Sequence, residues 1–182
     1  IDISYNVLNS CSNGINVDNC NNAMVFSNEV SNSQVGTGIT IQSASQGTVV
    51  FGNDISTNKS YGGTGSDLGA IYIAFTSEVR IIANNLIGNY SDAIQMRDCN
   101  RCQIIGNYIY GNAASGINIG NTSWGGDYNI VNANICNNNV RGIYIQTSSC
   151  DKNIITSNVC MSNSTANYTD SGTGTVSANN VT

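Results

Sequence analysis

The stretch Val50-Phe51-Gly52-Asn53-Asp54-Ile55 decides the fold, because its order of apolar, apolar, small, Asn, polar and apolar residues returns along the chain. The same frame occupies residues 25–30, 81–86 and 104–109. Residues 130–135 and 154–159 keep the frame, and this alignment places Ala133 and Ser157 in the Asn position. One structural unit is therefore predicted to repeat over most of the chain.

A second motif lies between the copies of the frame and starts with a small residue followed by alternating apolar and polar positions. Its copies begin at Gly14, Gly38, Ala70, Ala93, Gly116 and Gly142. Successive copies are 24, 32, 23, 23 and 26 residues apart, and a period in the twenties indicates a solenoid. Alternation with a period of two indicates strands. Each repeat is predicted to form a coil of two or three short parallel strands, with inward Asn side chains bonded from coil to coil.

With these two motifs, the chain resembles the right-handed parallel β-helix repeat family of the pectate-lyase-like superfamily. The resemblance runs from Ile3 to about Val159. It implies an all-β fold, a right-handed parallel β-helix solenoid of about seven to eight coils. We expect residues 1–182 to form a single domain that belongs to a longer chain or assembly. The family contains lyases, hydrolases, epimerases, tailspikes and adhesins, so the fold alone implies no particular activity.

Composition narrows the classes of function. Only 9% of the residues are charged, and the net charge is −5 with no basic stripe, which argues against nucleic-acid binding. No apolar run is long enough to suggest a membrane span. The chain starts within a strand-like segment and reads as a mature or excised piece of a longer protein. We expect no cofactor, and a secreted or cell-surface location.

The cysteines favour disulfides over metal binding. Cys136 and Cys160 share one position on adjacent coils, and Cys11 and Cys20 flank one strand, so these two pairs are the disulfide candidates. The remaining cysteines are Cys99, Cys102 and Cys150. A lone Cys-x-x-Cys at residues 99–102, in a chain without His, is weak support for zinc, and we expect no metal site.

Six Asn-x-Ser/Thr sequences are candidate glycosylation sites, and most of them are expected in corners, loops or the tail, where a glycan can be accommodated. They begin at Asn58, Asn89, Asn121, Asn163, Asn167 and Asn180. In a chain with 31 Asn, some of these sequences are expected by chance.

Two insertions and one outward column are candidate carbohydrate sites. Residues 59–68 contain Tyr61, and residues 122–128 contain Trp124 in a Gly-rich loop. Aromatic rings offer flat faces to sugars, although Trp124 is equally expected to fold over the stack and cover its corner. The second motif predicts an outward column made of Asn16, Thr40, Tyr72, Gln95, Asn118 and Tyr144. An ordinary solvated β face is the favoured interpretation of this column, and the alternative is a surface in which Tyr72 and Tyr144 bind a hydroxyl-rich ligand.

A charged column is the remaining chemical candidate. Glu78, Arg101, Asp127 and Asp151 each lie three residues before an apolar residue of the frame, on successive coils. The structural interpretation is a ladder of ions, in which Glu78 and Asp127 flank Arg101. The catalytic interpretation is an acid pair with a cationic clamp, to which Arg97 and Asp98 contribute from a nearby edge.

The catalytic signatures of the family are missing. The resemblance implies paired Asp with His in its hydrolases, clustered acids for calcium in its lyases and Asp-Pro-His in its alginate epimerases, and the chain contains neither His nor Pro. The sequence therefore favours a non-catalytic extracellular stalk, adhesin or filament subunit with weak glycan contact, associating end to end or with flanking domains. The alternatives are a polysaccharide-active enzyme that uses Glu78, Arg101 and Asp127, and a carbohydrate-binding module centred on Trp124.

Overall fold

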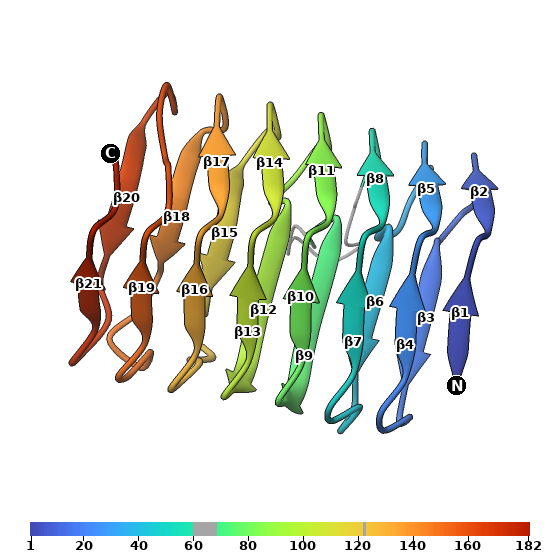
Figure 1. The fold of residues 1–182 in the computed structure, drawn as a ribbon, viewed down its shortest axis with the longest axis horizontal. Helices are drawn as coiled ribbons and strands as arrows, with labels where there is room; N and C mark the ends of the chain where they lie inside the picture. The colour runs from blue at the N-terminus through green and yellow to red at the C-terminus, as the bar shows by residue number, and fades with distance from the viewer. Residues whose placement is uncertain (60–68, 122) are drawn as a thin grey trace.

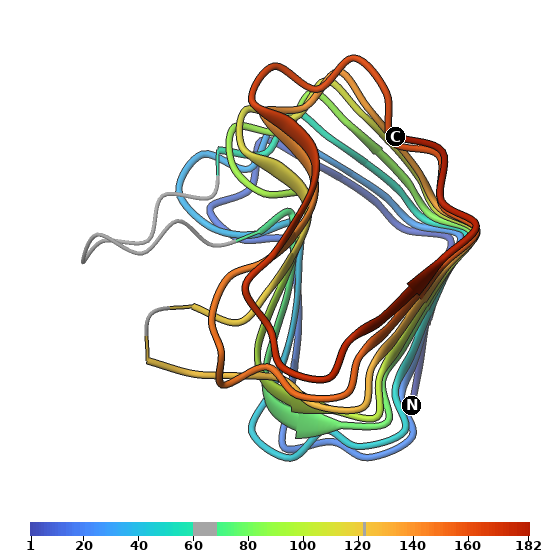
Figure 2. The ribbon, with the colours of Figure 1, turned by 90° about the vertical axis from the view of Figure 1, so that its left-hand side faces the viewer.

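The chain forms a parallel β-solenoid, in which each repeat is one coil and the strands of successive coils stack into three sheets (Figure 1). The computed structural model describes residues 1–59, 69–121 and 123–182, and within these residues every regular element is a strand. Viewed along the stack, the coils lie almost on top of one another (Figure 2). The predicted all-β solenoid is therefore confirmed.

Each sheet is built from strands that occupy the same place in successive coils. The first sheet contains β1 (Asp2–Ser4), β4 (Met24–Phe26), β7 (Val49–Phe51), β10 (Arg80–Ile82), β13 (Gln103–Ile105), β16 (Ile130–Asn132), β19 (Ile154–Thr156) and β21 (Val176–Ala178). The second contains β2 (Val7–Asn9), β5 (Glu29–Ser31), β8 (Asp54–Ser56), β11 (Asn85–Ile87), β14 (Tyr108–Tyr110) and β17 (Ile135–Asn137). The third contains β3 (Ile15–Asp18), β6 (Ile39–Gln42), β9 (Ile71–Ser77), β12 (Ile94–Asn100), β15 (Ser115–Ile119), β18 (Arg141–Ile145) and β20 (Ala166–Asp170).

The core is a continuous apolar column along the inside of the coils. In the first sheet the stacked residues Val50, Ile81 and Ile104 are completely buried. In the third sheet Ile71 and Ile94 pair in register and are equally buried. β-Branched side chains suit these inward positions, because each packs against an identical or similar neighbour on the next coil. The alternating pattern of both motifs is thus the pattern of burial.

The corner between the first and second sheets, which we call the Asn corner, has the same form in every coil. Two residues follow the first-sheet strand there, and the first of the two has a positive φ. The second is always Asn, in the series Asn6, Asn28, Asn53, Asn84, Asn107, Asn134, Asn158 and Asn180. Each side-chain nitrogen donates to the side-chain oxygen of the next Asn at 2.9–3.0 Å. The predicted amide ladder is confirmed and is unbroken.

The predicted alignment was wrong by one residue in two coils. Val131, and not Ile130, pairs with Ile104, and Ile155 in turn pairs with Val131. Asn134 and Asn158 therefore occupy the Asn position that the sequence alignment assigned to Ala133 and Ser157. The cause is that Ile130 and Ile154 are apolar residues on the outer face, so each frame offered two plausible apolar pairs.

A second amide ladder, which was not predicted, lies between the second and third sheets. It contains Asn58, Asn89, Asn112, Asn139 and Asn163, each five residues after a member of the first ladder. Its side-chain nitrogens donate to the next side-chain oxygen at 2.9–3.3 Å. The constant spacing of five residues in the sequence is the signal that predicts it.

The corner between the third and first sheets, which we call the variable corner, differs from coil to coil. After β9 only residues 78–79 lead into the next strand, whereas residues 120–129 do so after β15. A solenoid tolerates such differences because loops can vary while the stacked strands keep their register.

Candidate functional site

A groove of about 280 Å³ lies at the variable corner, and we call it the corner groove. It is formed by the loop after β6, the ends of β9 and β12, and the residue that follows β12. Its lining residues are Ala44, Gln46, Phe75, Thr76, Ser77, Asp98, Asn100 and Arg101. The groove thus combines an aromatic ring, a carboxylate, amides and a guanidinium group.

Two exposed aromatic rings form one wall beside this groove. The rings of Phe75 and Trp124 meet edge to face, with their centroids 5.3 Å apart, and the two residues are 47% and 46% exposed. Phe75 has a φ of 53°, which is a rare conformation for a bulky side chain. Trp124 is a candidate from the sequence and Phe75 is not, since nothing in a β-rich stretch signals that one aromatic residue turns outward. Neither interpretation of Trp124 is complete: its ring packs on a neighbour and still keeps an open face.

The backbone around Trp124 is held in place by hydrogen bonds. The side-chain oxygen of Asn121 accepts from the N–H groups of Ser123 and Trp124 at 2.8 and 2.7 Å. The N–H of Asp98 donates to the carbonyl oxygen of Gly125 at 2.7 Å, which ties this loop to the neighbouring coil. The indole ring is therefore presented from an anchored segment.

Arg101 and Glu78 form an ion pair next to the groove, with 3.4 Å between Nε and Oε1. Both side chains are more than half exposed, so the pair adds roughly 0–1 kcal/mol to stability. A second groove of about 350 Å³ lies on the other side of Arg101 and is lined by Asn22, Gly47, Glu78, Arg80, Arg101 and Gln103. Arg101 therefore lines both grooves. Its proximity to Glu78 agrees with the predicted ladder of ions.

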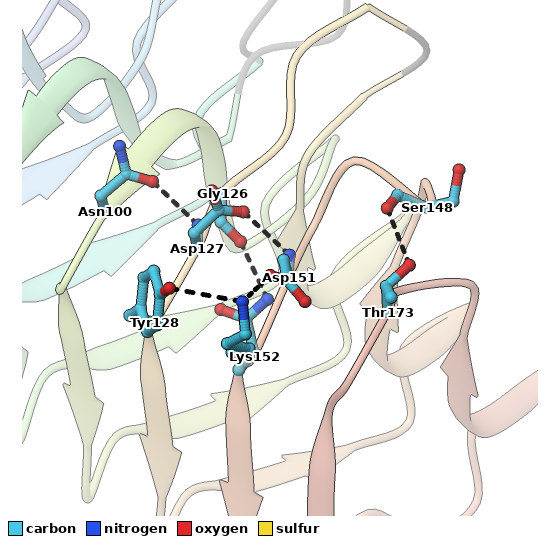
Figure 3. Close-up of polar contacts among 9 residues, drawn as sticks. Asn100, Gly126, Asp127, Tyr128, Ser148, Asp151, Lys152 and Thr173 are labelled. Carbon is cyan, nitrogen blue, oxygen red and sulfur yellow. Dashed lines mark hydrogen bonds and ion pairs between the residues drawn. The ribbon is translucent and has the colours of Figure 1, made fainter.

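The rest of the predicted charged column is corrected by the register of the coils. Tyr128 and Lys152, rather than Asp127 and Asp151, stack on Glu78 and Arg101, because Arg80, Gln103, Ile130 and Ile154 pair in register two residues later. Asp127 lies in the adjacent column. Its Oδ1 accepts from the N–H of Asp151 at 2.8 Å, and its own N–H donates to Oδ1 of Asn100 at 2.9 Å (Figure 3). Asp127 thus joins three coils and does not flank the Arg101 guanidinium as expected.

Lys152 closes this column of polar contacts. Its Nζ donates to Oδ2 of Asp151 and, at 3.4 Å, to the hydroxyl oxygen of Tyr128 (Figure 3). The hydrogen bond with Asp151 raises the pKa of Lys152, and the contact with Tyr128 adds to the shift. The contact with Tyr128 links neighbouring coils, and none of these three residues lines the corner groove.

The outward column of the third sheet is exposed at Asn16, as expected, and differs from the expectation in its middle coils. Tyr72, Gln95 and Asn118 point away from the core as predicted, yet they are only 7%, 4% and 6% exposed, so they do not face solvent. Tyr72 lies beside Arg97, whose guanidinium carbon is 5.4 Å from the ring centroid. Burial raises the pKa of Tyr72, and Arg97 offsets part of this shift. Tyr144 is half-buried with Arg141 over its ring, and Tyr61 lies outside the described residues.

The predicted glycosylation sites differ in their geometry. Asn58 and Asn89 are buried in the second amide ladder, so the folded chain has no room for a glycan at either, contrary to the expectation for corner residues. The side-chain nitrogens of Asn163 and Asn180 also donate hydrogen bonds. At Asn121 and Asn167 the side-chain oxygen accepts hydrogen bonds, and both residues are half-buried. Asn163 and Asn180 are half-buried as well, so all four of these residues stay as predictions.

All seven cysteines carry free thiols in the structure. Cys136 and Cys160 are buried on adjacent coils, as predicted, and a hydrogen bond between them together with burial raises the pKa of Cys136. Burial likewise raises the pKa of Cys99, next to Cys102. Cys11 and Cys20 are half-buried on either side of β3. Disulfides at the two candidate pairs remain predictions.

Neither a candidate metal cluster nor a candidate membrane-spanning helix occurs in the described residues. They contain no cluster of three or more His, Cys, Asp or Glu residues that could hold a metal ion. No helix of sufficient length and hydrophobicity to cross a membrane is found in the same part of the chain.

Comparisons with solved structures identify similar folds at low sequence identity. The periplasmic alginate epimerase AlgG matches with a TM-score of 0.69 at 14% identity, over 96% of this chain and 44% of the enzyme. The A-module of the mannuronan C-5 epimerase AlgE6 of Azotobacter vinelandii gives 0.62 and 18%, over 97% of this chain and 51% of the module. The Dettilon tailspike protein gives 0.64 and 19%, over 81% and 31%. The chain thus spans about half or less of these proteins, and at this identity the likeness concerns the fold.

The search of curated proteins found no match. The sequence family described as the right handed beta helix region matches residues 1–125, which is more than half of the chain. The stacked coils, the in-register apolar column and this match agree, and the chain therefore belongs to the right-handed β-helix family.

Proposed function

We propose that this β-helix is a surface or secreted protein that binds polysaccharide at the corner groove. The observation that carries the proposal is the exposed Phe75–Trp124 pair beside a groove lined by Asp98, Asn100 and Arg101. Aromatic faces pack on the apolar faces of sugar rings, and the polar side chains bind hydroxyl groups. The anchored backbone at Trp124 supports this role, since a pre-organised site loses less entropy on binding.

The similar structures support the same class of ligand. AlgG is an alginate epimerase and AlgE6 a mannuronan epimerase, so both act on polysaccharides. A tailspike shares the fold as well, which is in keeping with a surface location. In this chain the regular stack gives a rigid support, and we propose a structural or adhesive role in which glycan contact is made at one corner.

Affinity electrophoresis tests this proposal. Native gels that contain mannan, galactan, xylan, dextran, alginate or polygalacturonate would be run with the wild-type chain, Trp124→Ala and Tyr90→Ala. Tyr90 is a matched control, because it is an exposed aromatic residue distant from the variable corner. At least one polysaccharide should retard the wild type, and Trp124→Ala should weaken this about tenfold while Tyr90→Ala does not. Equal retardation of Trp124→Ala and wild type would refute the proposal.

A polysaccharide-active enzyme is the second candidate, and one observation favours it. Glu78 and Arg101 lie together at the second groove, where a carboxylate and a guanidinium can act on one substrate. The proposed role of Asp127 as a partner acid has less support, because its Oδ1 already accepts the N–H of Asp151. Product formation from any of the same polysaccharides, lost in Glu78→Gln, would establish activity. Turnover that persists in Glu78→Gln would exclude this residue as the catalytic acid.

A further inference from the structure

The outer face of the third sheet carries a buried polar cluster, which consists of Tyr72, Asp92, Gln95, Arg97 and Asn118. Tyr72, Gln95 and Asn118 occupy one position on three successive coils, and Arg97 follows Gln95 by two residues on the same face. Gln95 and Asn118 are 4% and 6% exposed, although they point away from the core. The cluster lies on the flat face of the sheet and shares no lining residue with the corner groove.

Three atoms of this cluster are buried and have no hydrogen-bond partner among the described residues. They are Oε1 of Gln95, Oδ1 of Asn118 and Nε of Arg97. The neighbouring polar atoms are engaged: Nδ2 of Asn118 donates to Oδ2 of Asp92 at 2.8 Å, and Oδ1 of Asp92 accepts from the N–H of Ser115 at 2.6 Å. Unpaired polar atoms are rare in protein interiors, and three that are adjacent on one face indicate a site that presents them to a ligand.

The chemistry of the three atoms defines the ligand. Two of them are acceptors, which require donors from the ligand, and one is a donor. A hydroxyl group can meet both needs, whereas a carboxylate only accepts hydrogen bonds and would leave both amide oxygens unpaired. A carboxylate would also lie near the buried carboxylate of Asp92, and repulsion between the two negative charges disfavours it.

We propose that this cluster is a second carbohydrate site, which binds a neutral sugar unit through adjacent hydroxyl groups and discriminates against uronates. The proposal rests on polysaccharide binding as the function of the chain and adds the charge class of the glycan. Tyr72 also lines a hollow of about 230 Å³ with Asn13, Ile15, Asn16, Thr37, Thr40 and Gln42. A glycan chain can therefore extend from the cluster along the sheet face, across coils that are about 4.8 Å apart.

The test uses the full chain in native gels that contain either neutral polysaccharides (mannan, galactan, xylan, dextran) or uronans (alginate, polygalacturonate). Gln95→Met removes the amide oxygen and keeps the length of the side chain. Thr169→Val is the matched control, since Thr169 continues the same column at the other end of the sheet. The wild type should be retarded more by a neutral polysaccharide than by either uronan. Gln95→Met should weaken that retardation about tenfold, as expected for one lost hydrogen bond to a buried group, and Thr169→Val should leave it unchanged.

Trp124→Ala in the same gels separates this proposal from the corner groove. Retardation that is lost in Trp124→Ala and unchanged in Gln95→Met would overturn the second site and leave the corner groove in place. Stronger retardation by a uronan would overturn the neutral specificity, and this result does not depend on the folding of any variant. No retardation in any gel would overturn both proposals. Thermal unfolding of each variant confirms that the solenoid is intact.

Discussion

The Asn corner and the variable corner are built from the same coils and obey opposite rules. At the Asn corner two residues follow the first-sheet strand in every coil, and the Asn side chains bond to one another along the whole stack. At the variable corner the connection ranges from residues 78–79 to residues 120–129, and charged and aromatic side chains gather there. The comparison indicates that the Asn corner holds the coils in register. The variable corner can therefore differ between coils and form a binding surface.

The largest effect is expected from breaking the amide ladder with Asn107→Ala. Asn107 is buried, donates to the carbonyl oxygen of Ile81 and to Oδ1 of Asn134, and accepts from the backbone and side chain of Asn84. Its loss leaves several buried polar groups unpaired, so the free energy of unfolding should fall by about 3 kcal/mol or more. Urea denaturation measures this change.

Asn132→Ala is the matched control for the ladder. Asn132 is half-buried on the next coil, and its side chain makes no hydrogen bond with the described residues. This variant should change the free energy of unfolding by less than about 0.5 kcal/mol. If Asn107→Ala were as mild as Asn132→Ala, the ladder would not be what specifies the stack.

Phe75→Gly sharpens the comparison, because it should separate stability from binding. Phe75 has a φ of 53°, and a glycine there relieves a strain of about 1–2 kcal/mol that an L-residue pays in this conformation. Part of this gain is offset by the lost contact with Trp124. We expect the thermal midpoint to stay equal or rise while polysaccharide affinity falls about tenfold.

Ala44→Gly provides the reference for Phe75→Gly, since Ala44 has a φ of 61° in the neighbouring coil and also lines the groove. It should be stabilising without loss of affinity. A loss of stability in Phe75→Gly, together with unchanged affinity, would show that Phe75 is a structural residue and not part of a binding wall.

Glu78→Gln should have a small effect on stability. The ion pair with Arg101 joins two side chains that are 56% and 62% exposed, and such pairs contribute roughly 0–1 kcal/mol. Chemical denaturation in low and high salt measures the change. A loss of more than about 2 kcal/mol would mean that the variable corner supports the stack as the Asn corner does.

The smallest expected effect is on the pH dependence of stability, through Tyr168 in the last coils. Burial, with a further contribution from the Asp170 carboxylate, raises the pKa of Tyr168 to about 12. The unfolded value is about 10, so the neutral phenol stabilises the folded state. This contribution is fully present below about pH 10 and is lost as the pH rises through about 12. The midpoint of the wild type should therefore fall more across this range than that of Tyr168→Phe, and an identical fall in both would contradict the shift.

Much of the fold was predictable because the same types of residue recur at the same positions of each coil. The inward Ile and Val positions, the strand register of the third sheet and the amide ladder all follow from the two motifs. The slip at Ile130 and Ile154 shows where this reasoning fails, since an apolar residue on the outer face looks like a core residue. The single slip displaced both the Asn positions and the predicted charged column.

The candidate site was predictable only in part. Trp124 and Arg101 could be selected from the sequence because they depart from the repeat. Whether they lie near one another depends on the path of the connection between β15 and β16, which the repeat does not determine. Phe75 turns outward because its φ is positive, and no residue pattern in the sequence predicts this conformation. The burial of Gln95 and Asn118 also could not be inferred from strand alternation, which sets the direction of a side chain and not what covers it.

The most direct test of the account is a paired measurement on Trp124→Ala, which compares its thermal midpoint with its retardation by the polysaccharide that binds the wild type. A division of roles between the two corners predicts an unchanged midpoint and a dissociation constant raised about tenfold. A lowered midpoint with unchanged affinity would contradict it, because Trp124 would then be part of the stack and the corner groove would not be the binding site.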